Sequence, residues 1–197
     1  YSFGAWLMHP TVTKIAVSDK GTIAALTPRG ISLITHKYMT LAEKAQHFDE
    51  LTEKYFTRNE GYHVGRLLRK YGDLESGWQP NSDNDGLFTG LYCASQCFRY
   101  AATGDKKAKE NAKRAVEAMI KLTEVTGKSG FTARATRYTD DEFFGTGNRE
   151  EWHAVEGNPD CEWLGETSSD EMTGHYFAYG IYYDLVADKN EKKKIAE

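Results

Sequence analysis

The sequence has little of what marks a disulfide-rich, membrane-spanning or nucleic-acid-binding protein. Its 197 residues include three cysteines, which are too few for a disulfide framework. The longest weakly polar stretch, residues 177–186, contains Asp184 and is much shorter than a bilayer span. Lysine and arginine number 25 against 29 aspartate and glutamate, so there is no general positive charge for a phosphate backbone. We therefore expect neither a membrane nor a nucleic acid as a partner.

The cysteines also give no sign of a cofactor. Cys93 and Cys97 are four residues apart on a predicted helix, where parallel Cα–Cβ vectors make a bridge awkward, so we expect buried packing residues. Cys161 with His153 or His175 has no recognised zinc spacing. We expect no cofactor.

What the sequence does have is an ordinary globular composition with many aromatic residues. Hydrophobic residues make up 40% and charged residues 27%, while Phe, Trp and Tyr reach 13%. This is more aromatic surface than a core needs, and it suits stacking on ring-shaped ligands. The chain starts at Tyr1 without a basic and then apolar leader, so we expect a processed or excised piece of a longer protein.

The first 36 residues follow the two-residue period of β-strands. Apolar and polar residues alternate over residues 12–17, 22–26 and 31–34, and the turn-forming sequences SDKG and TPRG separate these runs. The pattern predicts a three-stranded antiparallel meander as a first domain, residues 1–36. Its exposed edges should be covered by the helical body or by a neighbouring chain.

After residue 36 the apolar period changes to that of helices. TLAE at residues 40–43 and SSDE at residues 168–171 are capping boxes, and Asp85 can serve as an N-cap. The short Gly104-Asp105 connection makes the two helices beside it antiparallel neighbours. The predicted helices cover residues 40–58, 86–102, 106–126 and 168–187, and a last one begins near residue 188.

The helices are of two kinds. Those after Asp85 and Asp170 carry small and aromatic residues nearly all round, as helices buried on both sides do, whereas the helix over 106–126 is amphipathic. An alternation of inner and outer helices is the layout of an α/α toroid. The sequence therefore predicts a mainly α fold of antiparallel helical hairpins.

Three segments carry a family resemblance. DNDGLFTGLY at 83–92, FRYAATGD at 98–105 and TSSDEMTGHYF at 167–177 resemble bacterial proteins related to the six-hairpin glycosidase superfamily. The meander resembles a β-propeller blade. The resemblance implies that residues 37–197 form part of an α/α toroid, completed by the remainder of the same polypeptide or by a second chain. It also favours a secreted or periplasmic location.

The resemblance also implies a site. Asp85 and Asp170 stand before inner helices and would be the paired catalytic carboxylates of a domain that hydrolyses or eliminates across a glycosidic bond in a carbohydrate ligand. The alternative is that these residues only cap helices. In that case the chain is a non-catalytic glycan-binding or sensor domain, or a folding remnant without activity.

Further residues would line the same cleft. The long segment 128–167 has few regular signals, and loops of this length are usually functional or disordered. An arginine there suits a uronate carboxylate, and tryptophans give sugar rings apolar faces. The predicted substrate-binding residues are Arg134, Trp152, Trp163, His175, Tyr176 and Glu171.

A calcium loop is a weaker alternative at the same place. Asn81, Asp83 and Asp85 followed by Gly86 match the first half of such a loop. The twelfth position is Tyr92, so the bidentate glutamate of a complete loop is missing.

Overall fold

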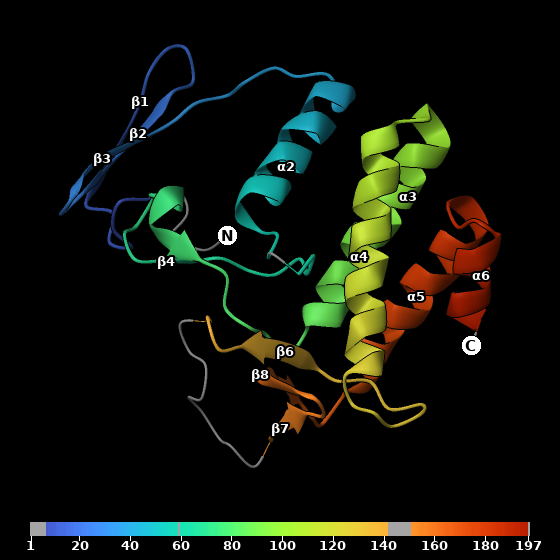
Figure 1. Ribbon diagram of the computed structural model, residues 1–197. Coiled ribbons are helices and arrows are strands. Elements are labelled where there is room, and N and C mark those ends of the chain that lie inside the picture. The colour runs from blue at the N-terminus through green and yellow to red at the C-terminus, as the bar shows by residue number, and fades with distance from the viewer. Residues whose placement is uncertain (1–6, 59, 142–150, 197) are drawn as a thin grey trace. The chain divides into compact units, whose positions relative to one another are not determined.

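The computed structural model describes residues 7–58, 60–141 and 151–196. The chain divides into two compact units, one formed by residues 1–56 and 66–79 and the other by residues 57–65 and 80–197. Figure 1 shows the helices and strands with the labels used below. Among the described residues, each helix is too short or too polar to cross a bilayer.

The first unit contains the predicted meander. Its three strands are β1 (Lys14–Val17), β2 (Ile23–Thr27) and β3 (Gly30–Ile34). They pair antiparallel in the order β1-β2-β3, which confirms the predicted order. The turn before β3 is held by Thr27, whose hydroxyl donates to the carbonyl of Gly30 at 2.8 Å.

The remaining elements of the first unit are one helix and a short hairpin. Helix α2 (Leu41–Tyr55) starts at the predicted capping box, with Thr40 accepting from the Glu43 N–H and the Glu43 carboxylate accepting from the Thr40 N–H. The hairpin pairs β4 (Leu67–Leu68) with β5 (Gly77–Trp78), and the 3₁₀ helix η1 (Leu74–Ser76) lies between these strands.

The second unit is built on three packed helices. Helix α3 (Asp85–Thr103) packs against both α4 (Lys106–Glu124) and α5 (Ser169–Leu185), and α6 (Lys189–Ala196) follows α5 (Figure 1). Gly104 ends α3 in the left-handed region at φ 70°, and the Asp105 side chain caps α4 by accepting from the Lys107 N–H at 2.8 Å. The predicted tight connection between neighbouring helices is confirmed.

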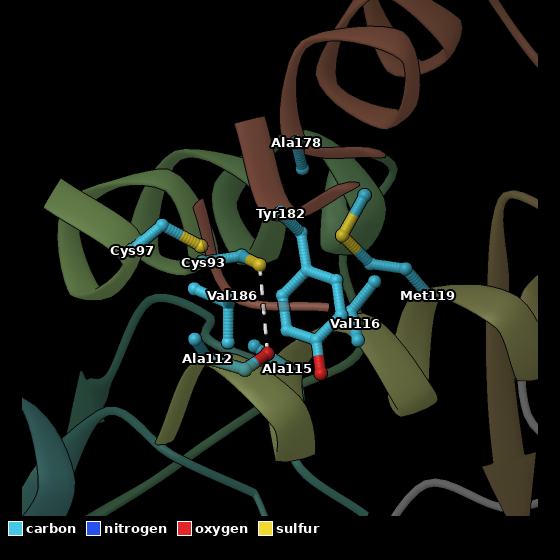
Figure 2. Packing of buried hydrophobic residues seen from close by; sticks show 9 residues of the cluster. All are labelled: Cys93, Cys97, Ala112, Ala115, Val116, Met119, Ala178, Tyr182 and Val186. Atoms are coloured by element: carbon cyan, nitrogen blue, oxygen red, sulfur yellow. Dashed lines mark hydrogen bonds between the residues drawn. The ribbon is translucent and has the colours of Figure 1, made fainter. Parts of the chain in front are cut away.

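Small side chains form most of the core between these helices. Figure 2 shows the cluster, in which the Cys93 thiol donates to the carbonyl of Ala112 at 3.5 Å. Cys93 and Cys97 are free and buried, which confirms their predicted packing role. The buried members of the cluster are Cys93, Cys97, Ala112, Ala115, Val116, Met119, Ala178, Tyr182 and Val186.

Two glycines allow α3 and α5 to approach closely. A Cβ on Gly90 would lie 2.6 Å from the carbonyl oxygen of Gly174, and a Cβ on Gly174 would lie 2.6 Å from the Cα of Leu87. Real Cβ atoms do not come so near other atoms, so any larger residue would separate the helices. This contact brings the N-terminal ends of α3 and α5 together.

The segment between α4 and α5 forms a third sheet. Its strands are β6 (Ala135–Tyr138), β7 (Trp152–Val155) and β8 (Asn158–Leu164), arranged antiparallel in the order β6-β8-β7. A second hydrophobic cluster forms between strand β8, helix α4 and the segments that precede α3 and β6. Its buried members are Tyr62, Val64, Ala118, Leu122, Ala133 and Trp163.

The prediction of a mainly α fold is wrong. The resemblances to an α/α toroid and to a propeller blade are wrong with it. The described residues form five helices and three small antiparallel sheets, so the fold is mixed α and β. In sequence, the segment between α4 and α5 forms a sheet, whereas a toroid would continue there with another helical hairpin. The meander has three strands, whereas a propeller blade has four.

Three local predictions about α3 and α5 are also wrong. These helices are not buried all round, because aromatic side chains such as Phe88 on α3 and Tyr176 on α5 are exposed. Asn84 rather than Asp85 stands at the N-cap of α3. Ser168 is the N-cap of α5, but its side chain makes no capping hydrogen bond, so the predicted second box does not form.

Candidate functional site

A buried carboxyl group lies at the first residue of α3. Asp85 is 0% exposed, and its oxygens accept from Arg58 Nη1 at 3.1 Å and from the Ser82 N–H at 3.0 Å. Burial raises the pKa of Asp85 to about 7, although the Arg58 guanidinium acts in the opposite direction. The predicted site residue Asp85 is therefore a proton-binding group whose affinity is tuned by a neighbouring cation.

Arg58 organises this part of the site and was not predicted. Its side chain donates to the carbonyl of Thr136 at 3.2 Å and lies 3.4 Å from a Glu60 carboxylate oxygen and 3.7 Å from one of Asp141. Its guanidinium carbon is 5.4 Å from the centre of the Tyr62 ring. Arg58 follows a helix in sequence and belongs to no recognisable motif. Its role depends on contacts with residues that are distant in sequence.

A second buried carboxyl group reaches the same helix end from α5. Glu171 accepts from the backbone N–H of Gly86 at 2.5 Å and of Leu87 at 3.1 Å. It thereby caps α3, whose own N-cap residue Asn84 makes no side-chain capping bond. Glu171 was predicted to complete a box on its own helix and to contact substrate. Its side chain instead joins the two helices.

Burial and hydrogen bonding act in opposite directions on Glu171. The residue is 0% exposed, and this burial raises the pKa of its carboxyl to about 7. The two N–H donors and the nearby Arg134 lower it, and they are the weaker influences. Asp85 and Glu171 also repel each other as anions, which adds to the pKa of Asp85. The charge of Glu171 is thus a minor influence on the pKa of Asp85, after burial, Arg58 and Ser82.

His175 lies one turn after Glu171 on α5 and is 1% exposed. Its Nδ1 is 3.2 Å from the Tyr179 hydroxyl, while its Nε2 has no hydrogen-bond partner among the described residues. A Cβ added to Gly86 would lie less than 3.0 Å from both His175 Nε2 and Glu171 Oε1, so these two atoms border the same small space. Burial lowers the pKa of His175 to about 4, which keeps the ring neutral at pH 7.

Arg134 connects the loops that lead into α3 and α5. Its Nε donates to the carbonyl of Asp83 at 2.8 Å, and its Nη1 donates to that of Glu166 at 3.1 Å. Nη2 lies 4.0 Å from an Asp83 carboxylate oxygen and the side chain is partly exposed. Glu166 has a φ of 56°, a left-handed conformation that is uncommon outside glycine. Arg134 therefore holds together the loops before α3 and α5, and its role in substrate binding stays a prediction.

Asp170, the second predicted catalytic carboxylate, lies on the surface at the first turn of α5. The nearby Ser168 side chain is the main influence that lowers its pKa. Its neighbour Glu171 holds the buried position instead. Tyr176, another predicted substrate contact, is 72% exposed. The catalytic roles of Asp85 and Asp170 stay predictions.

The two predicted tryptophans belong to the third sheet. Trp152 on β7 lies beneath the Arg137 guanidinium, whose carbon is 3.9 Å from the ring centre. Trp163 on β8 is buried in the second hydrophobic cluster, with its ring 4.4 Å from that of His153 and 5.9 Å from that of Phe131. Trp163 thus contributes to packing, and Trp152 is the more accessible of the two.

The predicted calcium residues are engaged in other contacts or are open to solvent. A cation beside Asp85 would have to compete with the Arg58 guanidinium, and the Asp83 side chain is 68% exposed. No cluster of three or more His, Cys, Asp or Glu side chains within residues 7–58, 60–141 and 151–196 is arranged to hold a metal ion. The role of Asn81 as a calcium ligand stays a prediction.

Comparison with known proteins identifies no relative of this chain, because no family model, no curated protein and no solved structure matches it. The resemblance to six-hairpin glycosidases, which the fold already contradicts, gains no support from sequence or structural similarity. A function for this chain is therefore inferred from the geometry around Asp85 and Glu171.

Proposed function

We propose that the chain acts on a glycan by acid–base chemistry at Asp85 and Glu171. One observation carries the proposal: two fully buried carboxyl groups from different helices meet at the N-terminus of α3. Burial raises the pKa of each to about 7. A pKa near the working pH is what a general acid or base requires. Breaking a glycosidic bond needs one carboxyl group in each role.

The surroundings of the two groups divide these roles. Because the ionised forms repel each other, a charged Glu171 favours the protonated form of Asp85. Arg58 lies against Asp85 and stabilises its charged form, so Asp85 is the base. Glu171 has no cation within ion-pair distance among the described residues and is the acid.

Two features of the second unit support a sugar substrate. Phe88 on the first turn of α3 is 44% exposed, and Tyr176 and Phe177 on the second turn of α5 are also exposed. Such rings offer flat apolar faces of the kind that pack on pyranose rings. Nη2 of Arg134, with only a weak contact to Asp83, suits the carboxylate of a uronate.

The proposal is tested by turnover of a panel of neutral and uronate-containing oligosaccharides. We expect Asp85→Asn and Glu171→Gln to lower turnover by at least about a hundredfold, because each removes a proton-transferring group. Asp170→Asn is the matched control, since it changes an exposed carboxylate beside Glu171 and should leave turnover unchanged. Circular dichroism of each variant verifies that the fold survives.

Equal turnover in all four proteins would remove Asp85 and Glu171 from the mechanism. A loss confined to Asp170→Asn would transfer the catalytic role to the exposed carboxylate. Either outcome contradicts the assignment without depending on which glycan is the best substrate.

A second candidate is a non-catalytic glycan-binding domain. It is favoured by the complete burial of both carboxyl groups and by their bonds to Arg58 and to the backbone of α3, which are contacts typical of structural residues. This candidate predicts that oligosaccharides bind without conversion. Binding should then be weakened by Tyr176→Ala and not by Asp170→Asn, as measured by calorimetry.

A further inference from the structure

Three hydrogen-bonding side chains follow one another along a single face of α5. Glu171, His175 and Tyr179 are separated by four residues each, which places them in a row along the helix. Glu171 stands at the end that contacts α3, and Tyr179 stands two turns further along. The row therefore leads away from the carboxyl pair into the body of the second unit.

The contacts within the row are polar. The Tyr179 hydroxyl lies 3.2 Å from His175 Nδ1, and the opposite ring nitrogen, Nε2, has no partner among the described residues. The Glu171 carboxyl oxygen Oε1 borders the same space above Gly86 as Nε2 does. An unpartnered ring nitrogen at 1% exposure is costly unless a neighbouring group shares a proton with it. A proton passes directly between these two atoms only when the Glu171 carboxyl turns toward Nε2.

The far end of the row opens into a cavity between α4, α5 and α6. Its volume of about 280 Å³ is large enough for several water molecules, since each takes about 30 Å³ in the liquid. Tyr179 lines this cavity together with Ile120, Thr123, Glu124, Lys194 and Ile195. The charged ends of Glu124 and Lys194 are 56% to 59% exposed, so the cavity communicates with solvent.

We propose that Glu171, His175 and Tyr179 form a proton relay that connects the buried Glu171 carboxyl with water in the cavity between α4, α5 and α6. The inference rests on the proposed function in that it resupplies the same acid group, and it assigns His175 and Tyr179 as positioning residues that act through Glu171.

Each proton in the relay moves to the next acceptor. When Glu171 releases its proton, the O–H bond breaks and His175 Nε2 gains an N–H bond. The Nδ1–H bond then breaks in favour of the Tyr179 oxygen, and the Tyr179 hydroxyl passes its original proton to a water molecule. Glu171 ends as a carboxylate and the water as hydronium, while His175 and Tyr179 stay neutral. The histidine has changed only its tautomer.

The buried environment suits a relay through neutral groups. Burial lowers the pKa of His175 to about 4 and raises that of Tyr179 to about 12, so neither carries charge near pH 7. The charged and titratable groups that face the row come from several elements. They are Asp85 and Cys93 on α3, Asp170 on α5, Glu124 on α4 and Arg134 before β6, and the Thr123 hydroxyl contacts Tyr179.

The relay makes a prediction that needs no substrate. As the pH rises through the titration of Glu171, the His175 ring should change from the Nδ1–H to the Nε2–H tautomer with the same midpoint. We would follow the ring nitrogens by ¹⁵N NMR and the Glu171 carboxyl by ¹³C NMR. A tautomer that stays constant through the Glu171 titration would overturn the relay.

Variants distinguish a proton relay from a purely structural role of these side chains. Glu171→Gln should abolish the pH-dependent change of tautomer. Tyr179→Phe should uncouple the tautomer from the titration of Glu171, because the partner of Nδ1 is lost. Tyr182→Phe is the matched control, since Tyr182 is a buried tyrosine of the same helix outside the row, and it should behave as the unmodified protein. Equal responses in the two tyrosine variants would contradict the proposal.

The NMR result and the turnover result are independent. A protein that switches tautomer but converts no glycan keeps the relay and loses the proposed function. A protein that converts glycans without a switch keeps the function and loses the relay.

Discussion

Gly86 occupies a position where any side chain would intrude between two buried polar groups. The residue is part of α3, where alanine is normally favoured over glycine by about 1 kcal/mol. A Cβ at this place would lie less than 3.0 Å from both Glu171 Oε1 and His175 Nε2. The need for space at the carboxyl pair therefore outweighs helix propensity at residue 86.

We expect Gly86→Ala to lower the free energy of unfolding by about 1–3 kcal/mol, the usual cost of overpacking a filled interior. The substitution pushes the Glu171 carboxyl away from the Gly86 and Leu87 N–H groups, so the cap of α3 is weakened as well. Urea-induced unfolding followed by circular dichroism measures the change.

Gly180→Ala is the matched control for that experiment. Gly180 lies within α5, is exposed, and has open space where a Cβ would be added. Alanine there should stabilise the protein by up to about 1 kcal/mol through helix propensity alone. If both alanines were stabilising, the space at Gly86 would not be required.

At the scale of elements, capping shows what a sequence can and cannot predict. TLAE at 40–43 forms the predicted box because all of its partners lie within one turn. SSDE at 168–171 has the same pattern, yet Glu171 caps α3 instead. The close approach at Gly90 and Gly174 offers it buried N–H groups 85 positions away in sequence, and no local pattern contains that information.

The third sheet was missed for a related reason. Strand β8 contains Pro159 and charged residues, and β6 has only four residues, so neither has a clear apolar alternation. Their stability comes from pairing with each other and from packing beneath α4. One signal for a hairpin was available in the sequence. Gly157 is the last residue of the two-residue connection between β7 and β8, and glycine is common in such turns.

Gly157 provides a test of that hairpin. Its φ of 75° lies in the left-handed region, which a β-branched residue adopts only at a cost of about 1–2 kcal/mol. Gly157→Val should therefore lower the thermal midpoint of unfolding, while Gly157→Asn should do so much less because asparagine tolerates this conformation. Equal midpoints for the two variants would argue against a required left-handed turn.

At the scale of the whole molecule, helices were predicted better than architecture. The four-residue spacing of apolar side chains and the Gly104-Asp105 turn were enough to place α3 and α4 to within about two residues. The arrangement of these helices in space depends on the segment that connects α4 to α5. We expected that segment to be part of an α/α toroid, and this expectation was wrong. The same assumption put Asp170 in a cleft, whereas Glu171 has the buried position.

The buried site should also control how stability depends on pH. Burial raises the pKa of Asp85 and of Glu171 to about 7 and lowers that of His175 to about 4. Between about pH 4.5 and 6.5 the folded protein retains two protons on the carboxyl groups that the unfolded chain releases, whereas the unfolded chain retains one on His175. The folded state thus binds one proton more at this site, and the site's contribution to the free energy of unfolding decreases as the pH rises, by about 1.4 kcal/mol per pH unit.

Variants isolate this contribution from that of other groups. In the Glu171→Gln variant, the site's contribution to the free energy of unfolding should no longer decrease between pH 5 and 6. The folded variant binds one proton fewer at this site than the unmodified protein does. His175→Gln should make the decrease steeper, because the opposing group is gone. Urea unfolding at closely spaced pH values provides the slopes. Parallel slopes in all three proteins would mean that Glu171 and His175 titrate in the folded protein as they do in the unfolded chain, and that their burial is without electrostatic consequence.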